Sequence, residues 1–312
     1  MTAEASRGGE GTEARRCGFA AIIGAPNAGK STLVNALVGS KVAIVTHKAQ
    51  TTRAPIRGIV ISGASQIVLV DTPGIFKPKR RLDRAMVDAA WSRAGDADVV
   101  VVLVDALRGL TDDVRPILET LETMRGRRLL VLNKIDRVRK DRLLALTAEI
   151  TDKLAFEATF MISALTGDGI ADLTRHLAGL MPLGEWHYPE DEISDAPMRS
   201  LAAEITREKL LLRLHDELPY AATVETALWK ELKGGAVRIE QTIYVERDSQ
   251  KQIVLGKGGR MIKEISMAAR KEIAELIEVD VHLFLFVKVR ERWGDDPERY
   301  REMGLELPKD GG

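Results

Sequence analysis

The sequence has little cysteine, few aromatic residues and no long hydrophobic run. Cys17 is its single cysteine, so an internal disulfide and a cysteine-rich metal site are both excluded. No apolar stretch approaches the roughly 18 residues that a membrane-spanning helix needs. Residues 1–16 are polar and lack the apolar centre of a secretory signal. We therefore expect a cytoplasmic protein with a disordered tail over residues 1–16.

The chain also has no net charge. Lys plus Arg and Asp plus Glu each number 46, so the overall charge indicates no partner. Any surface for nucleic acid must therefore come from local clustering of basic residues. Hydrophobic residues make up 45% of the 312 positions, which is enough for a sizeable core, and the length favours two domains.

Residues 24–31 predict a loop that binds phosphate groups. Two glycines are separated by four residues and followed by Lys30 and Ser31. Residues 19–23 are typical of a strand and residues 31–38 of an amphipathic helix, so the loop directs backbone N–H groups and the positive helix end at one point. Lys30 would reach the β- and γ-phosphates, and Ser31 would ligate Mg²⁺. The expected loop contacts are Gly24, Ala25, Pro26, Asn27, Ala28, Gly29, Lys30, Ser31 and Thr32.

Two later segments predict contacts to the metal ion and the γ-phosphate. Thr52 could add its hydroxyl to Mg²⁺, and the adjacent Thr51 remains an alternative. Asp71 follows a strand predicted over residues 66–70, where a carboxylate can hold a Mg²⁺-bound water. Gly74 would allow its N–H to approach the γ-phosphate. The nucleotide contacts expected here are Asp71, Thr72, Pro73, Gly74 and Ile75.

Residues 133–136, Asn-Lys-Ile-Asp, predict recognition of guanine. The Asp136 carboxylate can accept hydrogen bonds from the N1–H and the 2-amino group of guanine, an arrangement that adenine does not offer. The Lys134 stem can pack on the base, and backbone N–H groups after the strand predicted over residues 156–162 would face the guanine O6. The expected contacts are Asn133, Lys134, Asp136, Ser163 and Ala164. Alternating strands and helices over residues 17–181 predict a doubly wound, mostly parallel α/β sheet.

A second domain is predicted over residues 198–305, after a proline-rich, acidic linker at 182–197. Its patterns predict the order helix, strand, strand, helix, helix, strand, which resembles a type-2 KH domain. A Gly-x-x-Gly turn between helices lets a single-stranded RNA backbone approach closely. Residues 251–271 hold six basic residues and one acid, although a solvated basic helix face is the simpler interpretation of such a pattern alone. The expected RNA-binding residues are Gly256, Lys257, Gly258, Gly259, Arg260, Lys263, Arg270 and Lys271.

Together these motifs resemble the translation-factor-like P-loop GTPases. Ile75 stands where Ras-type switches have a glutamine that orients the attacking water. This is similar to the TrmE-Era-EngA-EngB-septin-like branch, which has a hydrophobic residue there. With the KH-like half, residues 18 to about 305 resemble the Era family, and the absence of a second phosphate loop disfavours the Der family. The resemblance extends to Leu218, Pro219 and Tyr220 and to residues 281–293.

The resemblance to Era implies a GTP-hydrolysing switch that binds the 3′ end of 16S rRNA through its KH domain. It further implies a part in 16S rRNA processing and small (30S) ribosomal subunit assembly, with a loose association with the inner membrane face. In that branch Asn27 would help to bind K⁺, so we expect slow, K⁺-stimulated turnover of GTP to GDP by a monomer that uses Mg²⁺. The implied catalytic residues are Lys30, Thr52, Gly74 and Asn27.

Two other functions are compatible with parts of this pattern. One is an RNA-binding scaffold whose nucleotide domain binds but hydrolyses poorly, since Ile75 cannot orient water. The other is a metabolic kinase that shares the phosphate loop, which residues 133–136 disfavour because they predict a guanine site.

Overall fold

The computed structural model describes residues 14–48, 51–53, 56–78, 80–214, 222–291, 293 and 297–306. Leu218, Pro219 and Tyr220, which belong to the family resemblance, lie outside these ranges, as do residues 1–13 of the expected tail.

The N-terminal domain is built on a six-stranded sheet in the order β2-β3-β1-β4-β5-β6. Only the β2–β3 pairing is antiparallel, so the expected mostly parallel sheet is confirmed. The strands are β1 (Arg16–Ile23), β2 (Ile56–Ser62), β3 (Ser65–Asp71), β4 (Val99–Asp105), β5 (Arg127–Asn133) and β6 (Ala158–Met161). The helices are α1 (Lys30–Val38), α2 (Arg81–Asp96), α3 (Arg115–Thr123), η1 (Ile135–Arg137), α4 (Lys140–Thr151) and α5 (Ile170–Leu180). No sequence prediction covered α4 or α5.

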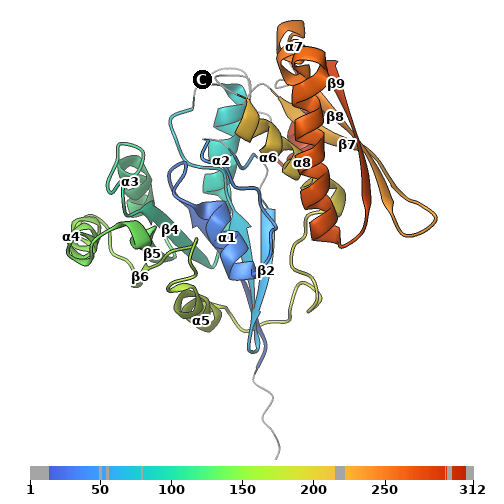
Figure 1. Ribbon diagram of the computed structural model, residues 1–312. Helices are drawn as coiled ribbons and strands as arrows, with labels where there is room; N and C mark the ends of the chain where they lie inside the picture. The colour runs from blue at the N-terminus through green and yellow to red at the C-terminus, as the bar shows by residue number, and fades with distance from the viewer. Residues whose placement is uncertain are drawn as a thin grey trace, which may run out of the picture.

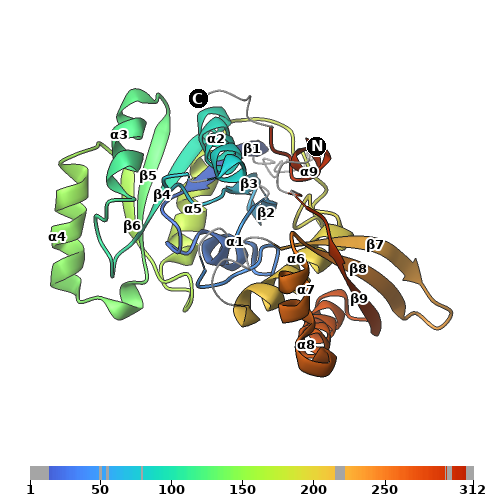
Figure 2. The ribbon, with the colours of Figure 1, turned by 90° about the horizontal axis from the view of Figure 1, so that it is seen from above.

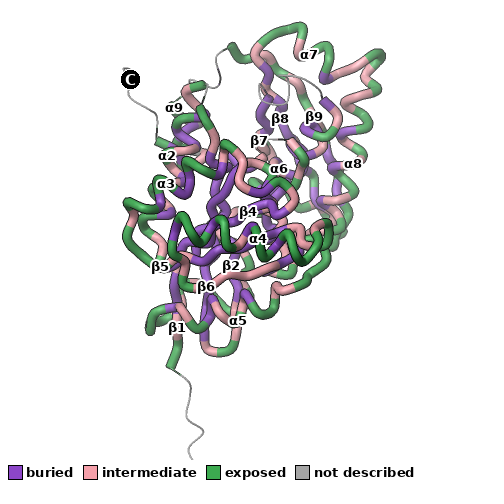
Figure 3. Tube along the Cα trace, turned by 90° about the vertical axis from the view of Figure 1, so that its left-hand side faces the viewer, coloured by how far each residue is buried: buried purple, intermediate pink, exposed green. Residues whose placement is uncertain are grey.

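Helices cover both faces of this sheet, which is why its central strands are largely apolar. Every residue of β3 and β4 is buried. On one face α1 and α5 bury Leu33, Leu173 and Leu177 in a common core, and α2, α3 and α4 pack on the other face. Figure 3 shows the central strands as buried and the outer side of α4 as exposed. The carboxyl ends of the parallel strands therefore remain the place for loops that bind a ligand.

The C-terminal domain has a three-stranded sheet in the order β7-β8-β9, with β7–β8 antiparallel and β8–β9 parallel. Its elements follow the predicted KH order. They are α6 (Met198–Arg213), β7 (Thr223–Glu231), β8 (Val237–Val245), α7 (Asp248–Leu255), η3 (Lys257–Gly259), α8 (Arg260–Ile277), β9 (Val281–Val289) and α9 (Pro297–Glu302). Buried residues of α6 and α8 share two cores with the sheet, so both helices cover one of its faces.

The two domains meet at α6, which lies on the side of the C-terminal domain that faces the GTPase domain (Figures 1 and 2) and contacts the loop after α1. The Glu208 carboxylate of α6 accepts hydrogen bonds from Lys41 Nζ at 2.8 and 3.0 Å. A small apolar cluster joins Met86 of α2 to Tyr300 and Leu305 near the C-terminus. Within the described residues, no helix combines the length and apolar composition needed to cross a bilayer.

Candidate functional site

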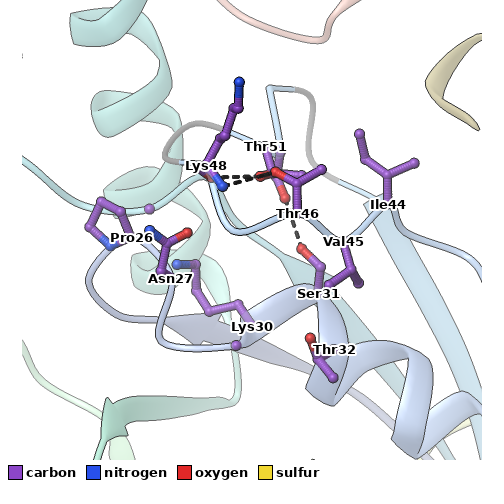
Figure 4. A pocket seen from close by; sticks show the side chains of 13 residues that line it. Pro26, Asn27, Lys30, Ser31, Thr32, Ile44, Val45, Thr46, Lys48 and Thr51 are labelled. Carbon is purple, nitrogen blue, oxygen red and sulfur yellow. Dashed lines mark hydrogen bonds between the residues drawn. The ribbon is translucent and has the colours of Figure 1, made fainter. Parts of the chain in front are cut away.

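The phosphate loop runs from the end of β1 to the start of α1, as predicted. Gly29 has a φ of 99°, and a Cβ added there would lie 2.4 Å from Asn133 Nδ2, so only glycine fits. Asn27 also adopts a left-handed φ of 64° and is exposed at the loop tip. The loop borders a small cavity of about 50 Å³. Figure 4 shows Asn27 and Lys30 on one side of this cavity and Thr46, Lys48 and Thr51 on the other.

Lys30 is held inside the loop by backbone carbonyls. Its Nζ donates to the carbonyls of Gly24 at 3.1 Å and Ala25 at 3.0 Å. Burial lowers the pKa of Lys30 to about 8, although the nearby Asp71 opposes this effect. A bound polyphosphate would favour the charged ammonium, so this amine suits a site for phosphate.

Ser31, Thr52 and Asp71 converge at the start of α1. Ser31 Oγ donates to Asp71 Oδ2 at 2.7 Å, and Thr52 Oγ1 donates to the same oxygen at 3.1 Å. The other oxygen, Asp71 Oδ1, is buried and has no hydrogen-bond partner among the described residues. Burial raises the pKa of Asp71, against the lowering effects of Ser31 and Lys30. A buried carboxylate oxygen without a donor and two hydroxyl groups match the oxygen ligands that Mg²⁺ prefers.

The choice between the two threonines follows from their side-chain contacts. Thr51 Oγ1 lies 2.7 Å from Thr46 Oγ1 and donates to the Lys48 carbonyl at 2.8 Å, so this hydroxyl stabilises the conformation of its own loop. The Thr52 hydroxyl lies 2.9 Å from Ser31 Oγ and is buried. The structure therefore brings Thr52, and not Thr51, to the expected metal position.

Gly74 and Ile75 lie directly behind the phosphate loop. A Cβ on Gly74 would meet Pro26 Cα at 3.0 Å, and the Ile75 N–H donates to the Gly24 carbonyl at 3.1 Å. The Ile75 side chain is only 6% exposed and packs in the domain core, so it cannot take part in orienting water. The Thr72 hydroxyl donates to the Ile22 carbonyl at 2.7 Å, so its side chain holds the loop to β1.

Asn133 joins three segments of the site. Its Nδ2 donates to the Ala28 carbonyl at 2.9 Å, and its Oδ1 accepts from the N–H of Lys134 at 2.8 Å and of Ala164 at 3.0 Å. The side chain is 2% exposed. Because one amide fixes both loops of the expected guanine site to the phosphate loop, its role here is to position them.

The other residues expected to recognise the base come from the two loops that this amide joins. Lys134 Nζ donates to the Asn27 carbonyl and to Asp105 Oδ2, both at 2.7 Å, so its stem lies along the phosphate loop. Asp136 is exposed in η1, while Ser163 is buried and accepts from the Thr166 N–H. Asp105, which holds Lys134, belongs to none of the predicted motifs. Its position at the end of the apolar strand β4 could have indicated a residue near the site.

The Gly-x-x-Gly loop connects α7 to α8, as predicted. Gly256, Gly258 and Gly259 have φ values of 70°, 61° and 77°, which explains the need for glycine. Buried Ile265, Ala269 and Ile273 define the inner face of α8. The expected RNA-binding side chains Lys257, Arg260, Lys263, Arg270 and Lys271 are all exposed. Arg260 and Lys271 pair with acids one turn later, at 3.1 and 3.8 Å, so part of the charge is neutralised.

Residues of the C-terminal domain hold the loop that carries Thr52, and no motif predicted them. Glu208 accepts from the Val45 N–H at 2.8 Å, and Arg207 donates to the Thr51 carbonyl. Lys48 donates to the Leu214 carbonyl. These contacts join residues more than 150 positions apart, so sequence patterns carry no signal for them.

The two domains match two family models. The description "50S ribosome-binding GTPase" matches residues 19–134, and "KH domain" matches residues 217–294. The GTPase Era of Bradyrhizobium sp. (strain ORS 278) is 65% identical over 310 residues, covering 99% of this chain and 100% of the relative. The chain belongs to the Era family of GTPases. The GTPase Era of Rhizobium meliloti (strain 1021) is 66% identical over 294 residues, covering 94% of each chain.

Solved Era structures have the same architecture. An Era in complex with MgGDPNP and nucleotides 1506–1542 of 16S ribosomal RNA superposes with a TM-score of 0.88 at 36% identity. It covers 94% of this chain and 100% of that chain. An Aquifex aeolicus Era variant bound to GDP·AlF4⁻ gives the same TM-score, identity and coverage. The expected fold, with a GTPase domain followed by a KH domain, is therefore confirmed.

Proposed function

We propose that this Era GTPase hydrolyses GTP with Mg²⁺ held by Ser31, Thr52 and, through a water, Asp71. The observation that carries the proposal is the buried Asp71 Oδ1, which has no partner among the described residues, beside two hydroxyls that share the other oxygen. Mg²⁺ supplies charge stabilisation at the phosphates. Lys30 would bind the β- and γ-phosphates, and the Gly74 N–H would face the γ-phosphate.

The same proposal assigns base recognition to the loops that Asn133 joins. Asp136 would accept from guanine, the Lys134 stem would pack on its plane, and the Ser163–Ala164 backbone would face O6. The Asn133 contacts to Ala28 and Ala164 support this assignment because they place these loops beside the phosphate site.

K⁺ would substitute for an arginine finger, with Asn27 as one ligand. Two observations support this: Ile75 is buried in the core, and Asn27 borders the phosphate cavity. We expect slow hydrolysis that is faster in K⁺ than in Na⁺. Asn27→Ala should abolish the difference, while Asn27→Asp, which keeps an oxygen donor, should retain it. Equal rates in both salts, with an unchanged rate in Asn27→Ala, would contradict the proposal.

The KH domain would bind the 3′ end of 16S rRNA, and the protein would act in 16S rRNA processing and assembly of the small (30S) subunit. The exposed basic face of α8 and the glycine loop support RNA binding, as does the related Era structure with RNA. We further propose a monomer in the cytoplasm with a loose association with the inner membrane face.

GTP binding and RNA binding would be coupled through α6. Arg207 and Glu208 contact the loop that carries Thr52, and Glu272 of α8 pairs with Lys41 and Lys209. A ligand that orders this loop would therefore shift α6 and α8 against it. Linkage requires that RNA also change the nucleotide affinity.

The test compares hydrolysis of GTP and ATP in K⁺ buffer, with and without a pyrimidine-rich rRNA 3′ end. We expect hydrolysis of GTP but not of ATP, and we expect RNA to change the rate of GTP hydrolysis. If RNA alters neither hydrolysis nor nucleotide affinity, the coupling is wrong. The second candidate is an RNA-binding scaffold that hardly hydrolyses, which the buried Ile75 favours. RNA and GTP binding with no turnover in either salt would select it.

A further inference from the structure

A cavity of about 750 Å³ lies between the two domains, apart from the nucleotide site. Its walls come from the start of β2, the last turns of α2, the first half of α6 and the first residues of β7. This volume falls within the range of small-molecule sites. None of the motifs accounts for it.

The side chains around this interdomain cavity are unusually rich in arginine. Five arginines face three carboxylates, which leaves a formal excess of two positive charges in a protein of zero net charge. The arginines are Arg53, Arg57, Arg93, Arg199 and Arg207, and the acids are Asp195, Glu204 and Glu225. Three of the arginines belong to the GTPase domain and two to α6, so an anion here would contact both domains.

Arg207 provides independent evidence for an anionic ligand. It is 2% exposed, and its Nη1 has no hydrogen-bond partner among the described residues. Its other nitrogens donate to Glu204 and to the Thr51 carbonyl. Burial, and after it the charge of Arg207, lowers the pKa of Arg53 to about 9. Glu204 offsets part of the repulsion between these two buried guanidinium groups, and an anion at the unpartnered Nη1 of Arg207 would offset more of it.

The first turn of α6 adds to the positive potential. This 16-residue helix begins at Met198 after Pro197, and residues of its first turn line the cavity. The N-terminus of a helix carries a partial positive charge, although the Ser200 N–H of this helix already donates to the Pro197 carbonyl at 2.8 Å. Phosphate groups bind at such helix ends, and planar guanidinium groups bind phosphate through paired hydrogen bonds.

We propose that the interdomain cavity binds a phosphate group, carried either by a small phosphorylated molecule or by the backbone of an RNA. Two short connections would transmit the effect of the bound phosphate to the nucleotide site of the GTPase domain. Arg207 also holds the Thr51 carbonyl, and Arg53 directly follows Thr52. Occupancy would therefore fix the loop that carries the expected metal ligand and the angle between the domains.

Binding is tested by calorimetric titration of inorganic phosphate into the full-length protein, saturated with GDP and Mg²⁺ so that the phosphate loop is filled. Ionic strength is held constant with chloride. We expect saturable binding at one site, weakened on the order of tenfold by Arg93→Gln or Arg199→Gln. Arg175→Gln on α5 removes the same charge at an exposed position and should leave binding unchanged. Thermal unfolding of each variant identifies any that is misfolded.

A competition experiment distinguishes the two sources of phosphate. If the RNA backbone occupies the cavity, Arg93→Gln weakens binding of the pyrimidine-rich RNA, and inorganic phosphate competes with that RNA. If a small molecule is the ligand, the RNA affinity is unchanged and phosphate binds equally well with RNA present. Absence of saturable phosphate binding, or equal affinity in both folded arginine variants and the wild type, overturns the proposal without affecting GTP hydrolysis.

Discussion

Asn133→Ala tests whether one buried amide holds the nucleotide site together. The substitution removes three hydrogen bonds, to Ala28, Lys134 and Ala164, each between 2.8 and 3.0 Å. At about 1 kcal/mol net for each bond, the free energy of unfolding should fall by about 3 kcal/mol. Because nucleotide must then order two loops on binding, GDP affinity should fall at least about tenfold, or about 1.4 kcal/mol.

Asn35→Ala is the matched control. The Asn35 side chain also makes three hydrogen bonds, to the Ala43 carbonyl and to the N–H groups of Val42 and Ala43. It lies outside the guanine loops, so its loss should lower stability to a similar extent with little change in GDP affinity. Urea unfolding of the full chain gives the free energy, and a fluorescent GDP analogue gives the dissociation constant.

Three results would contradict this reasoning. A loss of stability below about 1 kcal/mol in Asn133→Ala would mean that water replaces the lost partners. An unchanged GDP affinity would mean that the loops are ordered without the amide. Equal losses of affinity in both variants would assign the effect to general destabilisation.

Three more predictions concern charged groups. Burial lowers the pKa of Lys30 to about 8, and a bound polyphosphate should raise it again, so nucleotide binding without Mg²⁺ should take up protons above about pH 8. Calorimetry in buffers of different ionisation enthalpy measures this proton uptake. Absence of uptake would contradict a lowered pKa of Lys30 in the free protein. Asp136→Asn should shift the preference from guanine toward xanthine nucleotides, because the new side chain donates a hydrogen bond where the Asp136 carboxylate accepts one. Competition binding measures the relative affinities, and retained guanine selectivity would refute the assignment. Glu208→Gln should remove a coupling of about 1–3 kcal/mol between RNA and GTP while leaving basal hydrolysis unchanged. The substitution removes a carboxylate that Lys41, Lys209 and the Val45 N–H share, and these partners hold the pKa of Glu208 below its usual value despite burial. A full response to RNA in this variant would show that α6 does not carry the coupling.

The motifs and the order of elements could be predicted because they are written in contiguous residues. The phosphate loop, residues 133–136 and the Gly-x-x-Gly turn each need a few neighbouring residues with fixed backbone conformations. Strand β4 and residues 67–70 of β3 form apolar runs because both of their faces are buried, so they can be recognised from the sequence without knowledge of the neighbouring strands. These local signals were sufficient for both domains and for the Era family.

Tertiary structure alone decided how distant side chains meet. Thr51 and Thr52 are equivalent in sequence, and only the folded loop places the Thr52 hydroxyl on Asp71. The three contacts of Asn133 and the arginine-lined interdomain cavity join segments from separate parts of the chain. Their geometry depends on the order of the strands and on where α6 packs against the GTPase domain. The local periodicity of the sequence predicts neither of these. For this reason the sequence determined the class of chemistry, while the fold decided which residues perform it and how the two domains are connected.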